Sequence, residues 1–105
     1  MEKVGIIFYK PMIPQIGAQI GHTEIVKLVL LVANDKSPKG LKGQTPLHAA
    51  AKSGHIEVVK TFLENIEDAN PKDTEEWTPF HFAAFNGHSE IVQIIINMDL
   101  EIRSA

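Results

Sequence analysis

Apolar and polar positions along this chain recur with a period of 33 residues. The string QTPLHAAA at residues 44–51 is echoed by WTPFHFAA at residues 77–84. A second string begins with glycine and histidine and continues, one residue later, with glutamate and two aliphatic residues; its copies start at Gly21, Gly54 and Gly87. Three copies in one register predict a repeat architecture built from a single structural unit.

The first string predicts the start of a short helix. Thr45 and Thr78 are suited to the N-cap position, because a threonine hydroxyl can accept a hydrogen bond from a backbone amide that has no partner within the helix. Pro46 and Pro79 then occupy the first helical position, where a missing amide hydrogen costs nothing. The alanines that follow make one face of this helix small enough for a second helix to approach closely.

The second string predicts a turn followed by a second helix. Gly54 and Gly87 can take the left-handed conformation that ends a first helix. Glu57 and Glu90 then lie in the first turn of the second helix, where negative charge favours the helix dipole. Residues 58–63, VVKTFL, give that helix a mostly apolar face. Each unit is therefore predicted to be a helix hairpin.

Together the two strings resemble the ankyrin repeat over roughly residues 12–98. The resemblance implies an all-α solenoid of stacked helix-turn-helix units with projecting loops and a concave face. We expect an N-terminal extension or cap at 1–11, a divergent first repeat at 12–42, a second repeat at 43–75, and a third repeat with the C-terminal end at 76–105.

Some positions depart from the ankyrin pattern. Residues 12–15, MIPQ, stand where Thr-Pro-Leu-His is expected, so the first unit is either a divergent repeat or a modified N-terminal cap. Ile66 occupies a glycine position after the second helix, and we expect Asn65 to take the left-handed conformation instead. Glu76 replaces the turn glycine represented by Gly43, which predicts that the loop geometry differs between units.

Composition narrows the classes of function. A chain of 105 residues forms one small domain, and a net charge of -3 provides no basic field for nucleic acid or anionic lipid. The apolar run at residues 4–9 is too short for the apolar region of a signal peptide. Residues 25–33 are interrupted by Lys27 and are too short to span a membrane. The absence of cysteine excludes disulfides, thiolate metal sites and cysteine nucleophiles, and it fits a location in the cytoplasm or the nucleus.

The histidines raise the possibility of a metal site or acid–base chemistry. His22 begins a His-x-Glu string similar to part of a zinc deaminase signature, but the Pro-Cys-x-x-Cys that this signature requires is absent. Histidine falls on only two repeat positions, occupied by His48 and His81 in one case and by His22, His55 and His88 in the other. The ankyrin resemblance implies that these side chains make hydrogen bonds that tie a helix start or a turn to the next repeat. We therefore predict no catalytic residue, no metal and no cofactor.

In ankyrin repeats generally, a partner protein binds at the loop tips and the exposed face of the first helices. Carried over position by position, the resemblance places partner contacts at Leu41, Lys42, Gln44, Lys52, Ser53, Thr74, Glu75, Trp77, Phe82, Phe85 and Asn86. Trp77, Phe82 and Phe85 bring together the rigid aromatic area that dominates binding hot spots. The alternative is that Trp77 and Phe82 pack along the edge of the neighbouring unit.

The C-terminal helix is predicted to leave apolar residues uncovered, because several large side chains follow Val92, including Ile95 and Leu100. The terminal repeats would then be covered either by further repeats of a longer array or by self-association into a homo-oligomer. The leading hypothesis is a protein-interaction module. A structural segment of an array is the alternative, and an inhibitor masking a kinase or a transcription factor is a third possibility by family analogy.

Overall fold

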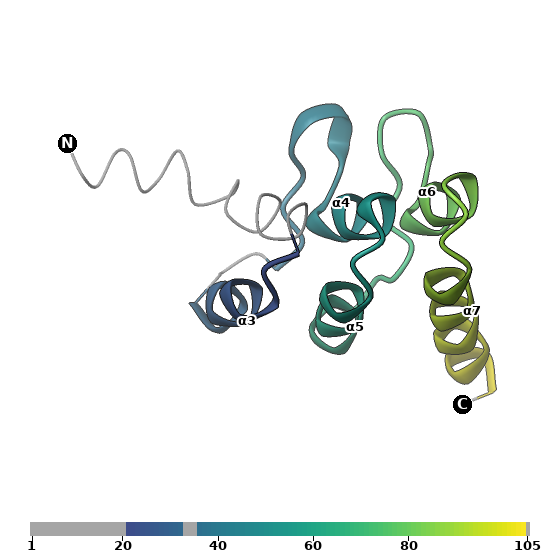
Figure 1. Cartoon of the computed structure of the whole chain (residues 1–105). Coiled ribbons are helices and arrows are strands. Elements are labelled where there is room, and N and C mark those ends of the chain that lie inside the picture. The colour runs from purple at the N-terminus through teal and green to yellow at the C-terminus, as the bar shows by residue number, and fades with distance from the viewer. Residues whose placement is uncertain (1–20, 33–35, 105) are drawn as a thin grey trace.

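The computed structural model describes the backbone of residues 21–32 and 36–104, with side chains described for 21–31 and 36–98. The predicted N-terminal cap and the first helix of the divergent repeat lie outside the described residues. Within them the regular structure is helical, and Figure 1 labels its α-helices. In chain order the elements are α3 (Thr23–Val32), the short 3-10 helix η1 (Leu41–Gly43), α4 (Pro46–Ser53), α5 (Ile56–Asn65), α6 (Pro79–Phe85) and α7 (Ser89–Ser104).

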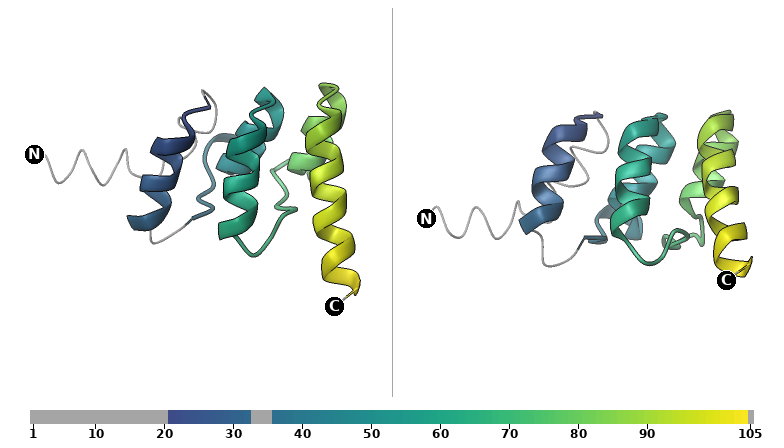
Figure 2. Two further views of the ribbon diagram at one scale, coloured as in Figure 1. Left: turned by 60° about the horizontal axis from the view of Figure 1, so that its bottom comes forward. Right: turned by 90° about the horizontal axis from the view of Figure 1, so that it is seen from below.

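The helices form two layers, as an ankyrin solenoid requires. α4 packs on α6 in one layer, while α3, α5 and α7 stand side by side in the other, as both views of Figure 2 show. Each hairpin, α4 with α5 and α6 with α7, joins the two layers. The loops before α4 and α6 project beyond the first layer in the same direction (Figure 1). The predicted all-α solenoid with projecting loops is confirmed.

The first helix of each hairpin begins as the sequence predicts. Thr45 and Thr78 are extended N-cap residues whose hydroxyls accept a hydrogen bond from the amide of the third helical residue. That residue is a histidine in both repeats, and its ring nitrogen accepts from the N-cap amide in return. The result is a reciprocal capping box in which histidine takes the role usually filled by glutamate or glutamine.

The helix ends agree with the prediction at the glycines but not at Asn65. Gly54 and Gly87 take left-handed φ angles of 82° and 76°. Asn65, by contrast, remains the last residue of α5, and Ile66 caps it with an extended φ of -118°. The expectation of a left-handed Asn65 is therefore wrong, because the chain leaves this helix by extending rather than by reversing its handedness.

The two loop tips differ, although at a different position from the one expected. Gly43 and Glu76 have nearly the same left-handed φ, 68° and 66°, so glutamate adopts the conformation of the glycine that it replaces. The difference lies one residue earlier, where Lys42 has a φ of 57° and Glu75 does not share this positive angle. Glu76 therefore carries backbone strain that a glycine would avoid.

The core lies between the layers and across the repeats. Its largest fully buried side chains include Phe62, Leu47 and Ile91, and the paired alanines Ala50 and Ala51 are completely buried where α4 meets its neighbours. Small side chains at these positions allow the helices to approach closely. No helix of the described residues is long and apolar enough to cross a membrane.

The C-terminal helix is only partly as predicted. Ile95 is 2% exposed and belongs to the core, so its expected place on a terminal face is wrong. The neighbouring Ile96 is 37% exposed instead. The side chain of Leu100, which was expected on the same terminal face, lies outside those that the structure describes.

Candidate functional site

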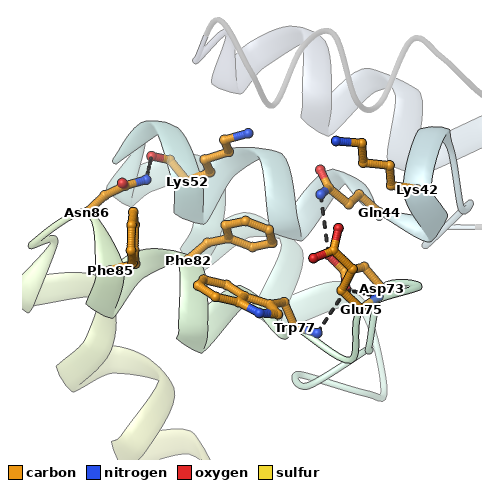
Figure 3. Close-up of a pocket in the computed structure, with 9 residues that line it drawn as sticks. All are labelled: Lys42, Gln44, Lys52, Asp73, Glu75, Trp77, Phe82, Phe85 and Asn86. Carbon is orange, nitrogen blue, oxygen red and sulfur yellow. Dashed lines mark hydrogen bonds between the residues drawn. The ribbon is translucent and has the colours of Figure 1, made fainter.

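A pocket of about 300 Å³ opens between the projecting loops and the first helices of the second and third repeats. Figure 3 shows that its walls come from the two loops, α4 and α6. Most of the predicted partner contacts line it, together with one residue that the sequence did not single out. The lining residues are Lys42, Gln44, Lys52, Asp73, Glu75, Trp77, Phe82, Phe85 and Asn86.

Three aromatic side chains of the third repeat form one continuous cluster along the pocket. The ring centroid of Trp77 lies 5.1 Å from that of Phe82 and 5.7 Å from that of Phe85. Phe82 also packs edge-on against His48 of the second repeat, with ring centroids 5.8 Å apart. At these separations, aromatic rings attract one another in addition to the stabilisation that comes from burying their surface.

The cluster is only partly buried. This bears on whether Trp77 and Phe82 are available to a partner or pack along the edge of the neighbouring unit. Both side chains are half-buried and keep part of their surface open to solvent. The Phe82 ring contacts His48 of the neighbouring unit, whereas the Trp77 ring contacts His81, Phe82 and Phe85 of its own unit. Phe85 is 77% exposed, although it is a large apolar side chain. The cluster is thus anchored at one end and presented to solvent at the other.

The second repeat contributes a cation to this aromatic surface. The ammonium of Lys52 lies 5.5 Å from the centroid of the Phe82 ring, within reach of a cation–π attraction. The backbone carbonyl of Lys52 accepts a hydrogen bond from the side-chain amide of Asn86 at 3.0 Å. Contacts from the third repeat therefore hold the C-terminal end of α4 beside the pocket.

Asp73 organises the loop on the opposite side of the pocket. One of its carboxylate oxygens accepts hydrogen bonds from the backbone amides of Trp77 and Glu75, at 2.8 and 2.9 Å. The other accepts from the side chain of Gln44 at 3.4 Å, across the two repeats. Burial acts to raise the pKa of Asp73, but the amide hydrogen bonds from Trp77 and Glu75 outweigh it and the pKa is lowered. Asp73 thus stays ionised and holds the loop closed.

His48 joins the two repeats that form the pocket. Its Nδ1 accepts a hydrogen bond from the Thr45 amide at 3.0 Å, and its Nε2 donates to the backbone carbonyl of Trp77 at 2.8 Å. This pair of contacts requires the neutral ring with its proton on Nε2. Burial lowers the pKa of His48 and so favours the same form. The prediction that this histidine ties a helix start to the next repeat is confirmed.

His81 repeats only half of this arrangement. Its Nδ1 accepts from the amide of Thr78 at 2.9 Å, as in the repeat before it, but the side chain is exposed. Its ring also lies 5.7 Å from that of Trp77. At the last repeat the histidine therefore caps its own helix and supports the aromatic cluster.

The Gly-His histidines lie against the preceding repeat, opposite to the expected direction. The ring of His55 packs on Gly21, and that of His88 packs on Gly54. The Nε2 of His88 also donates to the carbonyl of Lys52 at 3.1 Å. His22, at the same position of the first unit, is exposed. These rings serve the stacking of repeats.

Three of the predicted partner contacts lie outside the pocket wall. Leu41 is 88% exposed at the tip of its loop, and Ser53 is exposed at the end of α4. Thr74 is exposed, and its backbone amide donates to the carbonyl of Lys42 at 2.9 Å, which links neighbouring loops. These residues border the pocket region without lining it.

The comparisons with known proteins agree with this architecture. The sequence model of the family described as ankyrin repeats, in three copies, matches residues 15–104. No curated protein sequence matches the chain significantly. Ankyrin repeats are generally protein–protein interaction modules and are typically non-enzymatic. The family match covers most of the chain and coincides with the two-layered stack of helix hairpins, and the chain therefore belongs to the ankyrin-repeat family.

Proposed function

We propose that the chain binds a partner protein through the pocket between its loops and first helices, with Trp77, Phe82 and Phe85 as the apolar anchors. The observation that carries this proposal is the exposure of Phe85, 77% for a phenylalanine that continues a packed aromatic cluster. A solvent-exposed phenylalanine contributes little to the stability of the repeat. Its surface is, however, the type that partner proteins bury in hot spots.

The support around this anchor is packed and hydrogen-bonded, which favours binding. Trp77 is held at its backbone by Asp73 and His48, and its ring packs on Phe82. A partner that covers the rings of Trp77 and Phe82 would cost this chain little conformational freedom, because these two rings already pack on each other. Preorganised aromatic area therefore supports a site for a side chain or helix of the partner that presents apolar atoms.

Charges around the cluster favour a partner of mixed character. Lys42 and Lys52 line one part of the pocket, and Glu75 lines another (Figure 3). Asp73 already accepts hydrogen bonds within the chain, so Glu75 is the carboxylate more available to a partner. A bound surface with an apolar centre, an acidic group near the lysines and a basic group near Glu75 would be complementary to the pocket.

The experiment compares partner capture by the intact chain and by a variant in which the three aromatic anchors are replaced by alanine. Captured proteins are identified by mass spectrometry, and the affinity for the purified partner is then measured by isothermal titration calorimetry. The Phe85→Ala single variant should weaken binding by about 2 kcal/mol, roughly thirtyfold, as expected for a hot-spot aromatic residue. Its fold should be unchanged, because the side chain that it removes is largely exposed.

The matched control is Leu31→Ala on α3, which also removes a large apolar side chain that is 81% exposed but is not one of the pocket-lining residues. This variant should bind as tightly as the intact chain. Equal affinity for the intact chain and Phe85→Ala would remove this phenylalanine from the site. Capture that survives replacement of all three aromatic residues would refute the proposed site as a whole.

A further inference from the structure

The helices α3, α5 and α7 occupy equivalent positions in successive repeats, so their exposure can be compared residue by residue. In the central helix α5 both sides are covered. Val58 and Thr61 on one side are 1% and 7% exposed, and Val59 and Leu63 on the other are 0% and 5% exposed. This pattern is the signature of a helix with a neighbour on each side.

In α3, the first described helix of the row, only one of these sides is covered. Val26 and Leu30, the counterparts of the second pair in α5, are 1% and 4% exposed. Ile25 and Leu28, the counterparts of the first pair, are 45% and 64% exposed. Figure 2 shows α3 at one end of the row, with α5 on one side of it. The N-terminal face, defined by Ile25 and Leu28, therefore presents apolar side chains without a helix of the row against them.

In α7, at the other end of the row, the opposite side is open. Ile91, which corresponds to Ile25, is 0% exposed. Ile96, which corresponds to Leu30, is 37% exposed, and Val92 is half-buried. The C-terminal face, defined by Val92 and Ile96, is thus the half of the internal interface that the N-terminal face lacks.

A second, independent pattern shows the same complementarity. A Cβ atom added to Gly21 would lie 2.7 Å from the ring of His55, and one added to Gly54 would lie 2.7 Å from the ring of His88. A Cβ atom added to Gly87 would meet no atom of another part of the chain within 4 Å. The exposed His22 is the remaining histidine of this series, so the chain carries an open glycine at one end and a histidine of the matching type at the other.

We propose that a second copy of this chain stacks on the first, head to tail, with its N-terminal face on the C-terminal face of the first copy. His22 of the second copy would cover Gly87 of the first, as His55 covers Gly21 and His88 covers Gly54 within one chain. Ile25 and Leu28 would pack beside Val92 and Ile96. A second copy is the occupant because it carries both halves in the register of the internal interface.

This contact joins two different faces, so it does not close on itself. A pair of stacked copies still presents one open N-terminal face and one open C-terminal face, and further copies can add at either end. Association should therefore rise steadily with concentration, without a plateau at the dimer. It uses the ends of the stack and leaves the aromatic pocket open.

The test is sedimentation velocity on the intact chain and on two variants, Leu28→Glu and Ile96→Glu. Each variant places a charge on one face, at a side chain that is already exposed. The average mass of the intact chain should rise with concentration. Each variant alone should remain a monomer, because one face is blocked in every molecule. An equimolar mixture should form a dimer and nothing larger, since each variant supplies the face that the other lacks.

The control is Leu31→Glu, which adds the same charge to α3 outside the N-terminal face. Its counterpart in α5 is the exposed Glu64, so this position tolerates glutamate, and the variant should associate as the intact chain does. A strictly monomeric intact chain at every concentration would overturn the proposal, and so would a mixture of the two blocked variants that stays monomeric. An independent readout without substitutions is the change in the Gly87 amide resonance on dilution of the intact chain, which the proposal requires and a monomer would not show.

Discussion

Replacing His48 by alanine should strongly destabilise the chain, because this ring is buried between the second and third repeats and bonds to both. The side chain is 0% exposed and bonds to the amide of Thr45 and the carbonyl of Trp77. The matched substitution is His81→Ala, at the same position of the next repeat. There the ring caps its own helix but is exposed to solvent.

The His48→Ala substitution should lower the free energy of unfolding through two lost hydrogen bonds and a cavity. The amide of Thr45, a residue that is 1% exposed, loses its acceptor, and a buried donor without a partner costs about 1–3 kcal/mol. The carbonyl of Trp77 loses one bond worth about 1 kcal/mol but keeps the amide of Asp73 at 2.9 Å. Removing the buried ring leaves a cavity worth about 2 kcal/mol. The expected total is about 5 kcal/mol, comparable to the whole stability of a small domain.

The second substitution should cost only about 1 kcal/mol, the usual value of a helix cap, because water can replace the exposed ring. Urea unfolding followed by far-ultraviolet circular dichroism measures both. We expect His81→Ala to unfold at a slightly lower urea concentration than the intact chain, and His48→Ala to be largely unfolded without denaturant at room temperature. Equal losses for the two variants would refute the idea that the bond to Trp77 and the burial between repeats make His48 the link.

Three further predictions concern stability. Glu76→Gly should stabilise the chain by about 1 kcal/mol in urea unfolding, since it relieves a left-handed glutamate, and a loss of stability would contradict the strain. Gly54→Ala should cost more than Gly87→Ala, because both backbones are left-handed but only the first meets a histidine ring at 2.7 Å; equal costs would show that the contact is unimportant. Because the pKa of His48 is lowered by burial, the unfolded state binds the proton more readily, so the free energy of unfolding should fall as the pH drops below about 6.5. A free energy of unfolding that stays constant across that range would contradict the assigned neutral form.

Local signals along the sequence predicted most of the fold. A threonine followed by proline favours a helix start, and Thr45 and Thr78 both cap helices as expected. Gly54 likewise ends α4 in the left-handed conformation. Each of these features depends on a few neighbouring residues, so a short stretch of sequence is enough to predict it.

The sequence predictions are wrong where contacts between distant parts of the chain determine the local conformation. Glu76 is left-handed because its loop is held by hydrogen bonds to Asp73 and through Thr74 to the preceding loop, and these contacts do not appear in the residue type at position 76. Asp73 was missed for the same reason, since its partners are amides that only the folded loop brings to its carboxylate. Ile95 and Ile96 differ by one residue in helix phase, and this phase decides which side chain enters the core.

For the candidate site, the repeat register placed the aromatic residues on one surface but did not determine their exposure. Phe82 is half-buried because His48 of the preceding repeat packs against its edge, while Phe85, one turn further on, extends into solvent. The position of a residue within the repeat predicts on which side of its helix the side chain lies. The neighbouring repeat decides how much of that side remains available.

Binding of a partner protein at the loops and first helices can be checked by mapping the bound surface of the isotope-labelled chain by nuclear magnetic resonance. On addition of the captured partner, the largest shift changes should fall on the Trp77 indole, the Phe85 amide and the loop around Glu75. The outer turns of α5, around Lys60 and Glu64, should change little. Changes concentrated on α5, with the signals of Trp77 and Phe85 unmoved, would show that the partner binds elsewhere.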